Sequence, residues 1–219
     1  MIGRGVDQIL PYPCSPRLHE DYVSSAVAYV EFAEQVSGWI RRPVGFDYIW
    51  GAALDRLQEC RPDARIVNLE TSITSSEDFE PKGINYRVST ANAVCLQVAG
   101  IDCCALANNH VLDWGEAGLI ETLKALDRMG VKTAGAGRNR DEARRPAILD
   151  VAAKGRVILV AFALPSSGAP PHWAASHETA GVNVLPDLSA NSAALVCGLL
   201  RSVAKTGDVM VASIHWGPN

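Results

Sequence analysis

The sequence predicts a layered α/β fold in a single domain over residues 1–219. Three segments, 64–69, 101–106 and 209–214, have the length and apolar composition of buried strands. Amphipathic segments lie between them; in 115–129 apolar residues recur at helical spacing. Strands that alternate with helices indicate helices packed on the faces of a sheet. No change of composition marks a linker to a second domain.

The first 100 residues are expected to contain three helices and one strand. Residues 1–16 are rich in Gly and Pro and are expected to form a loop. We expect a helix over 19–40, a second over 47–60 with Asp47 as its N-cap, and a strand over 64–69. A polar loop over 71–83 leads to a helix over 90–98, which ends at Gly100.

The second half continues the alternation. The strand 101–106 precedes the helix 115–129, which ends at Gly130, and a brief strand over 131–133. Residues 147–151 and 156–163 flank a turn at Lys154-Gly155 and predict a hairpin. A loop over 165–171, a helix over 189–205 and a strand over 209–214 complete the expected elements.

Charge and hydropathy exclude two classes of protein. Twenty basic and 24 acidic residues give a net charge of −4, which argues against a general nucleic-acid binder. The longest clean apolar run, 157–164, is far short of the roughly 20 residues that span a bilayer, so no membrane segment is expected. The negative net charge does not exclude an anionic substrate, because a bound metal ion can supply positive charge. Whether the protein is cytoplasmic or associated with the cell envelope stays open.

The six cysteines predict no structural metal site. They stand at positions 14, 60, 95, 103, 104 and 197, and none belongs to a CxxC pair. We expect them to be buried small side chains in a reducing compartment. Cys103 and Cys104 are neighbours in a predicted strand, so they are expected on opposite faces of the sheet.

The polar residues that suggest chemistry follow predicted strands. Asn68 and Glu70 come after the first, Asn108, Asn109 and His110 after the second, and His215 after the last. Sites in α/β sheets form where strand ends meet. Each group also has a structural interpretation: a solvated strand end, a polar turn in which Asp113 caps the next helix, or a hydrogen-bonded histidine.

Taken together, Glu70, Asn109, His110 and His215 predict a metal-assisted hydrolase. Carboxylate and amide oxygens with imidazole nitrogens are ligands for divalent cations. His110 is a candidate ligand or general acid, because its ordinary pKa lies near neutrality. Asn68 and Asn108 are expected to contact the metal or the substrate.

A series of short motifs covers nearly the whole chain. They are Gly3-Arg4-Gly5-Val6-Asp7, Tyr48-Ile49-Trp50-Gly51, Val67-Asn68-Leu69-Glu70-Thr71-Ser72, Lys82-Gly83-Ile84-Asn85-Tyr86-Arg87, Ala107-Asn108-Asn109-His110-Val111-Leu112-Asp113, Gly135-Ala136-Gly137 and Ser213-Ile214-His215-Trp216-Gly217. In this order they resemble the motifs of the CapA-type capsule synthesis proteins, the poly-γ-glutamate group, within the calcineurin-like metallophosphoesterase superfamily.

The resemblance implies an α/β/β/α sandwich and divalent metal ions (Mn, Zn, Fe or Mg), two in the complete protein. It implies that Glu70 is a bridging carboxylate, that Asn109 is a metal-binding amide and that His215 is a metal ligand. It implies that His110 is the catalytic histidine. Arg4, Lys82 and Arg87 are then candidate contacts for an anionic substrate.

The same comparison predicts that the chain is truncated at both ends. The family pattern begins with a strand that ends in Gly-Asp just before Met1, and continues beyond His215-Trp216-Gly217 to a further Gly-His motif. Both segments supply metal ligands in that pattern. The chain is therefore expected to bind metal more weakly than the complete protein does.

Two functions remain open from the sequence. The first is a metal-dependent hydrolase of a phosphoester or a related anionic bond, such as a γ-glutamyl bond, in cell-envelope polymer metabolism. The second is a non-catalytic partner in a capsule synthesis and export complex that binds an anionic polymer. Nucleotide binding by Gly135-Ala136-Gly137 is a weaker hypothesis, because the motif is too short for a dinucleotide fingerprint.

Overall fold

Two three-stranded sheets form the centre of the computed structural model, which describes residues 1–218. The first sheet is parallel, in the order β1 (Ile66–Asn68), β4 (Cys103–Ala105), β5 (Lys132–Ala134). The second has the order β10 (Val209–His215), β8 (Gly155–Ala163), β7 (Ala147–Val151). In it β10 is parallel to β8, and β7 is antiparallel, which confirms the predicted hairpin.

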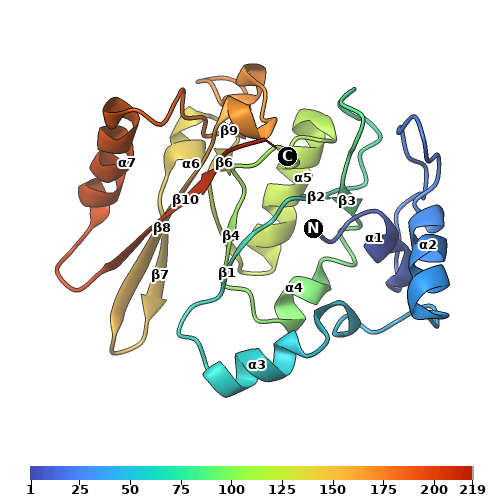
Figure 1. Cartoon of the computed structure of the whole chain (residues 1–219). Coiled ribbons are helices and arrows are strands. Elements are labelled where there is room, and N and C mark those ends of the chain that lie inside the picture. The colour runs from blue at the N-terminus through green and yellow to red at the C-terminus, as the bar shows by residue number, and fades with distance from the viewer. Residues whose placement is uncertain (219) are drawn as a thin grey trace.

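The two sheets and their helices stack in four layers (Figure 1). Small side chains such as Ala105, Ala134 and Ala161 pack between the sheets. The other face of the first sheet packs with α4 (Val94–Val98) and α5 (Gly115–Arg128). The other face of the second packs with α7 (Ala190–Val203). The predicted α/β layered fold is confirmed, and its layer order is α/β/β/α.

The N-terminal region differs most from the prediction. The expected loop over 1–16 contains α1 (Gly5–Ile9), and the expected helix over 19–40 is confined to α2 (Val27–Ser37). The residues before α2 form a turn instead, closed by a bridge between Arg17 and Ser25. The helix expected over 47–60 is two pieces, η1 (Tyr48–Trp50) and α3 (Ala53–Cys60), separated at Gly51, which has a φ of 50°. Asp47 makes no side-chain cap.

Several short elements were not expected. In the predicted loop over 71–83, β2 (Ser72–Ile73) pairs in parallel with β3 (Arg87–Val88). Further short elements are β6 (Ala136–Gly137), α6 (Arg140–Arg144), η2 (Pro165–Ser167), η3 (Pro171–Trp173) and β9 (Gly181–Val182). Such pieces have too few residues to show a hydrophobic period, so sequence patterns do not reveal them. The helix end at Gly100 is as predicted, with a φ of 63° directly after α4.

Within residues 1–218, no helix is both long and apolar enough to cross a bilayer.

The cysteines divide into buried and exposed thiols, and all six are free. Cys103 packs between the sheets and Cys104 packs against the helices, so the two face opposite sides as predicted. The expectation of burial is wrong for Cys60 and Cys197, which are exposed, and Cys14 is half-buried. Cys60 is the last residue of α3. Cys197 directly follows Val196, which faces the core, so Cys197 points outward from α7.

We expect only Cys60 and Cys197 to react within minutes with a thiol reagent such as DTNB at pH 8. The thiolate is the reactive form, and burial raises the pKa of Cys14 to about 12, of Cys95 to about 11 and of Cys103 to about 12. The absorbance of released thionitrobenzoate should therefore show two rapid equivalents, and six in denaturant. A third rapid equivalent in the native protein would contradict this packing.

Candidate functional site

Three side chains predicted as metal ligands meet where the strands end. Glu70 lies just after β1, Asn109 follows β4, and His215 is the last residue of β10. The Nε2 atom of His215 lies 3.0 Å from Oε1 of Glu70 and 3.1 Å from Oδ1 of Asn109. Side chains from both central sheets thus converge at one point, as the strand-end argument predicted.

The environment of His215 favours a neutral imidazole. Burial lowers its pKa below the ordinary value, and nearby His110 lowers it further, while the carboxylate of Glu70 acts in the opposite direction. A neutral ring has one nitrogen free to accept, which is the form that binds a metal ion. The shift therefore keeps His215 in its ligand form near neutral pH.

This cluster of donors fits one divalent cation. A single Nε2 hydrogen cannot satisfy both the Glu70 and the Asn109 oxygens fully, whereas a cation would attract all three donor atoms. One nitrogen and two oxygens are suitable for Mn, Zn, Fe or Mg. Over residues 1–218, no group of three His, Cys, Asp or Glu side chains could hold a metal, so a cation at this point would need the amide oxygen of Asn109 as its third donor. The second ion implied by the resemblance has no comparable donor set in this part of the chain.

Beside this cluster, His110 is held by a buried carboxylate. Its Nδ1 lies 2.7 Å from Oδ2 of Asp113, and the same oxygen accepts a hydrogen bond of 2.6 Å from the backbone N–H of Tyr86. The other carboxylate oxygen of Asp113 is 2.7 Å from Nζ of Lys82. This arrangement fixes the orientation of the His110 ring.

The expectation that Asp113 caps the following helix is wrong. The N-cap of α5 is Trp114, and no side chain caps it. Asp113 is fully buried, and its carboxylate pairs with the donors of Lys82, Tyr86 and His110. One feature of the sequence could have indicated the pairing with His110: Asp113 follows His110 by three residues in a tight turn.

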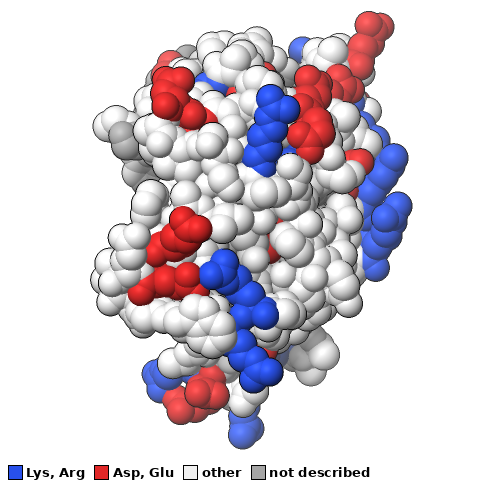
Figure 2. Space-filling model, turned by 90° about the vertical axis from the view of Figure 1, so that its right-hand side faces the viewer, with Lys and Arg blue, Asp and Glu red and all other residues white. Residues whose placement is uncertain are grey.

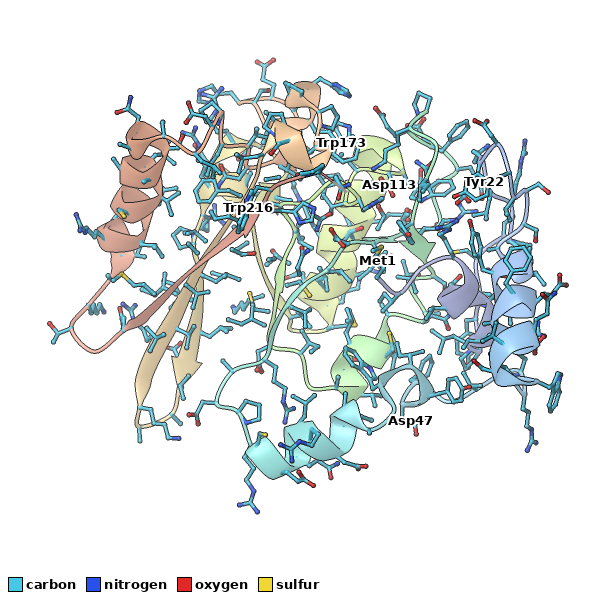
Figure 3. The ribbon with its side chains drawn as sticks, in the orientation of Figure 1. Met1, Tyr22, Asp47, Asp113, Trp173 and Trp216 are labelled. Atoms are coloured by element: carbon cyan, nitrogen blue, oxygen red, sulfur yellow. The ribbon has the colours of Figure 1, made fainter. Side chains whose placement is uncertain are left out.

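A cavity of about 440 Å³ lies against these groups. Lys82 lines it, so this predicted anion contact is well placed, and its amino group also bonds the backbone oxygen of Asn109. Tyr86, which the sequence did not single out, stands edge-on to the His110 ring at 4.6 Å between centroids. The lining residues are Met1, Glu70, Lys82, Ile84, Tyr86, Asn109, His110 and Gly168. In Figure 3, Met1 and Asp113 mark this region.

Asn68 and Asn108 shape the turn beside the cavity. The amide nitrogen of Asn108 donates to Oδ1 of Asn68 at 3.1 Å and to the backbone oxygen of Leu69 at 2.9 Å. Its amide oxygen accepts from the backbone N–H of His110 at 3.0 Å. Both asparagines tie the segment after β1 to the segment after β4, and neither lines the cavity.

The two arginines predicted as anion contacts are occupied by protein groups. Arg87 is buried, donates to the backbone oxygens of Ser76 and Ser15, and lies over the ring of Trp114. Arg4 pairs with the buried Glu20 at 2.5 Å. Neither arginine lines the cavity at Glu70. Of the three basic residues predicted as substrate contacts, the structure thus brings only Lys82 to this site.

Fold and site together define a layered α/β protein with a polar crevice where strands of both central sheets end. The chain belongs to the family of bacterial capsule synthesis proteins called PGA_cap, whose model matches residues 1–219. This agrees with the resemblance that the motifs indicated.

Relatives from two bacteria match the chain. Two strains of Mycobacterium tuberculosis, CDC 1551 and H37Rv, each have a "probable polyglutamine synthesis accessory protein" that is 41% identical over 221 residues. The match covers 100% of this chain and 58% of those relatives, so the chain spans little more than half of their length. An uncharacterized protein of Sinorhizobium fredii is 36% identical over 107 residues, which are 46% of this chain and 23% of that protein.

Proposed function

We propose that the crevice binds a divalent cation and hydrolyses a phosphoester, or a related anionic bond, in the metabolism of a capsule-type polymer. One observation carries the proposal. Nε2 of His215 lies within 3.1 Å of side-chain oxygens of Glu70 and Asn109, which come from separate strand ends. The family membership supports a role in capsule synthesis, and the printed name of the relatives, polyglutamine synthesis accessory protein, supports an accessory role alongside other proteins of a synthesis complex.

In this proposal Glu70, Asn109 and His215 hold the cation. When bound, the cation supplies a Lewis acid that offsets negative charge on the substrate and makes bound water more acidic. Lys82 lines the same cavity, and its amino group, paired with the Asp113 carboxylate on one side, can donate to a substrate oxygen on the other. Such fixed charges favour a transition state in which negative charge builds up.

His110 is the proposed general acid. Asp113 binds its Nδ1, which leaves Nε2 as the nitrogen that gives a proton to the leaving oxygen. The Asp113 carboxylate sets the tautomer and the orientation of the ring, as a carboxylate does for the histidine of a catalytic triad. Tyr86 packs against the ring edge and restricts its rotation.

A second candidate function is a non-catalytic one, in which the crevice binds an anionic polymer within a synthesis complex. The absence of three clustered His, Cys, Asp or Glu side chains in residues 1–218 favours this alternative. Lys82, paired with Asp113, would then be the basic side chain at the cavity that contacts the polymer, and binding would not need a cation.

Manganese titration of the purified chain distinguishes the two functions. After treatment with EDTA and dialysis, calorimetry should show one Mn²⁺ per chain, and Glu70→Gln should weaken binding by at least about 10-fold, since loss of even an indirect contact has that effect. His172→Ala is the matched control, because His172 is exposed and contacts Glu80 outside the crevice. Loss of binding in the control would contradict the assignment.

Hydrolysis of bis-(p-nitrophenyl) phosphate and of γ-glutamyl-p-nitroanilide, each measured with Mn²⁺, then identifies the bond. Release of nitrophenol or nitroaniline that disappears in Glu70→Gln and in His110→Ala supports the hydrolase. Poly-γ-glutamate binding that survives EDTA, without turnover of either probe, supports the alternative.

A further inference from the structure

A second cavity, mainly apolar, adjoins the crevice. It measures about 360 Å³ and lies between α1 and α2. Its walls are largely aliphatic and aromatic: Val6, Ile9, Tyr29, Val30, Ala33 and Ile40. The guanidinium of Arg4 also borders it, but that charge is paired with Glu20 and stacked 3.8 Å from the centroid of the Tyr29 ring. Figure 2 looks onto the side of the molecule that carries these helices and shows uncharged residues across its middle.

One aromatic ring separates this cavity from the crevice. Tyr86 lines both, as does Met1. On the crevice side the Tyr86 ring meets His110, and its hydroxyl accepts a hydrogen bond of 3.2 Å from Nη1 of Arg4. The two cavities are therefore neighbours that share the Tyr86 side chain as part of their walls.

The contrast between the two cavities limits what can fill both. A polar chain laid along the apolar walls would lose hydrogen bonds to water without replacing them, whereas each methylene group buried there gains free energy. At the other end, Lys82 and the proposed cation attract negative charge. A ligand that satisfies both ends has an anionic head and an aliphatic tail.

We propose that the substrate is a phosphate ester with an aliphatic chain, whose phosphate lies in the crevice and whose chain lies between α1 and α2. The location of the head rests on the proposed function, and the location of the tail rests on the second cavity. Tyr86 is the specificity residue at the junction, where the ester oxygen passes from the polar to the apolar walls.

Alkyl phosphates of increasing length test this. Calorimetry with the Mn²⁺-loaded chain, below micelle-forming concentrations, compares ethyl, n-butyl and n-octyl phosphate. Affinity should rise about two- to fourfold per added methylene group, so that the octyl ester, with six more of these groups, binds roughly 60- to 4,000-fold more tightly than the ethyl ester.

Two variants on α2 sharpen the test. Ala33→Glu puts a carboxylate in the apolar wall and should abolish the gain from chain length while leaving ethyl phosphate binding within about twofold. Ala33 is itself exposed, so the protein is expected to fold. Val36→Glu adds the same charge to the same helix at a position that is 88% exposed and outside the cavity, and should keep the gain.

Four results would overturn the proposal, and they separate an error in the tail from an error in the proposed function. Ethyl phosphate that binds with no gain for longer chains, or a gain that persists in Ala33→Glu, would refute the tail alone. Failure to bind any phosphate would refute the proposed function together with this inference. Dimers in sedimentation that Ala33→Glu dissociates would show that a second copy fills the cavity.

Discussion

Replacement of Asp113 by Ala is expected to lower the free energy of unfolding by about 3–5 kcal/mol, as removal of one partner from a buried ionic network does. Asp113 is fully buried, and its carboxylate accepts from the Tyr86 N–H at 2.6 Å and pairs with Nζ of Lys82 at 2.7 Å. Without the carboxylate, the Tyr86 N–H stays in the interior with no acceptor, and Lys82 loses its ion pair and keeps the backbone oxygen of Asn109 as a partner, so the desolvation of these donors is no longer fully offset.

Urea unfolding followed by circular dichroism measures this effect. The matched control is Asp127→Ala, which removes an exposed carboxylate near the end of α5 and should change the free energy by no more than about 0.5 kcal/mol. Equal stabilities for the two variants would mean that Asp113 does not bind the donors as described. Asp113→Asn keeps the shape of the side chain, so it should be less destabilising than Asp113→Ala while still weakening the hold on His110.

Replacement of Gly135 by Ala is expected to cost about 2–5 kcal/mol. Gly135 has a φ of 94°, a backbone conformation that side chains rarely adopt. An added Cβ would also lie 2.7 Å from Cβ of Ala107, just after β4 of the first sheet, and 2.8 Å from Cβ of Ala161 in β8 of the second. Backbone strain of about 1–2 kcal/mol and overpacking of about 1–3 kcal/mol therefore act together.

Gly130→Ala separates these two contributions. Gly130 has a φ of 73°, but an added Cβ would meet no atom within 4 Å. This variant should show the backbone strain alone, about 1–2 kcal/mol, in the same urea experiment. If Gly135→Ala were no more destabilising than Gly130→Ala, the result would contradict the close packing of the two sheets described at Gly135. In Gly135-Ala136-Gly137, considered above as a weak nucleotide motif, the small size of Gly135 has this packing reason, and Gly137 packs closely against Glu142 and Ala143 of α6.

The order of strands and helices was predictable where a segment is long or strongly periodic. The hairpin of β7 and β8 and the helix α5 are each signalled by several residues in sequence, and the structure has them. α1 was missed, since five residues show no period and Arg4, at its N-cap, has a positive φ of 55°. The break at Gly51 was missed because neighbours on both sides favour a helix.

The candidate site was predictable in its residue types but not in its pairings. Glu70, Asn109 and His215 follow strands, and parallel strand ends meet, so their convergence follows from the pattern. Arg87 carries the same charge as Lys82, yet it is buried beneath a different loop and packs over Trp114. No local pattern distinguishes these two basic residues.

The sequence by itself determined the family, the layered alternation of strands and helices, and the strand ends at which polar residues gather, because each depends on residues close together along the chain. Only the tertiary structure decided that Asp113 binds the ring of His110 instead of capping a helix, and that Tyr86 lies between a polar and an apolar cavity. It also decided which basic side chain lines the crevice: Lys82 does, whereas Arg4 and Arg87 do not. Those outcomes depend on which distant segments pack together, and burial and charge then select the partner of each side chain.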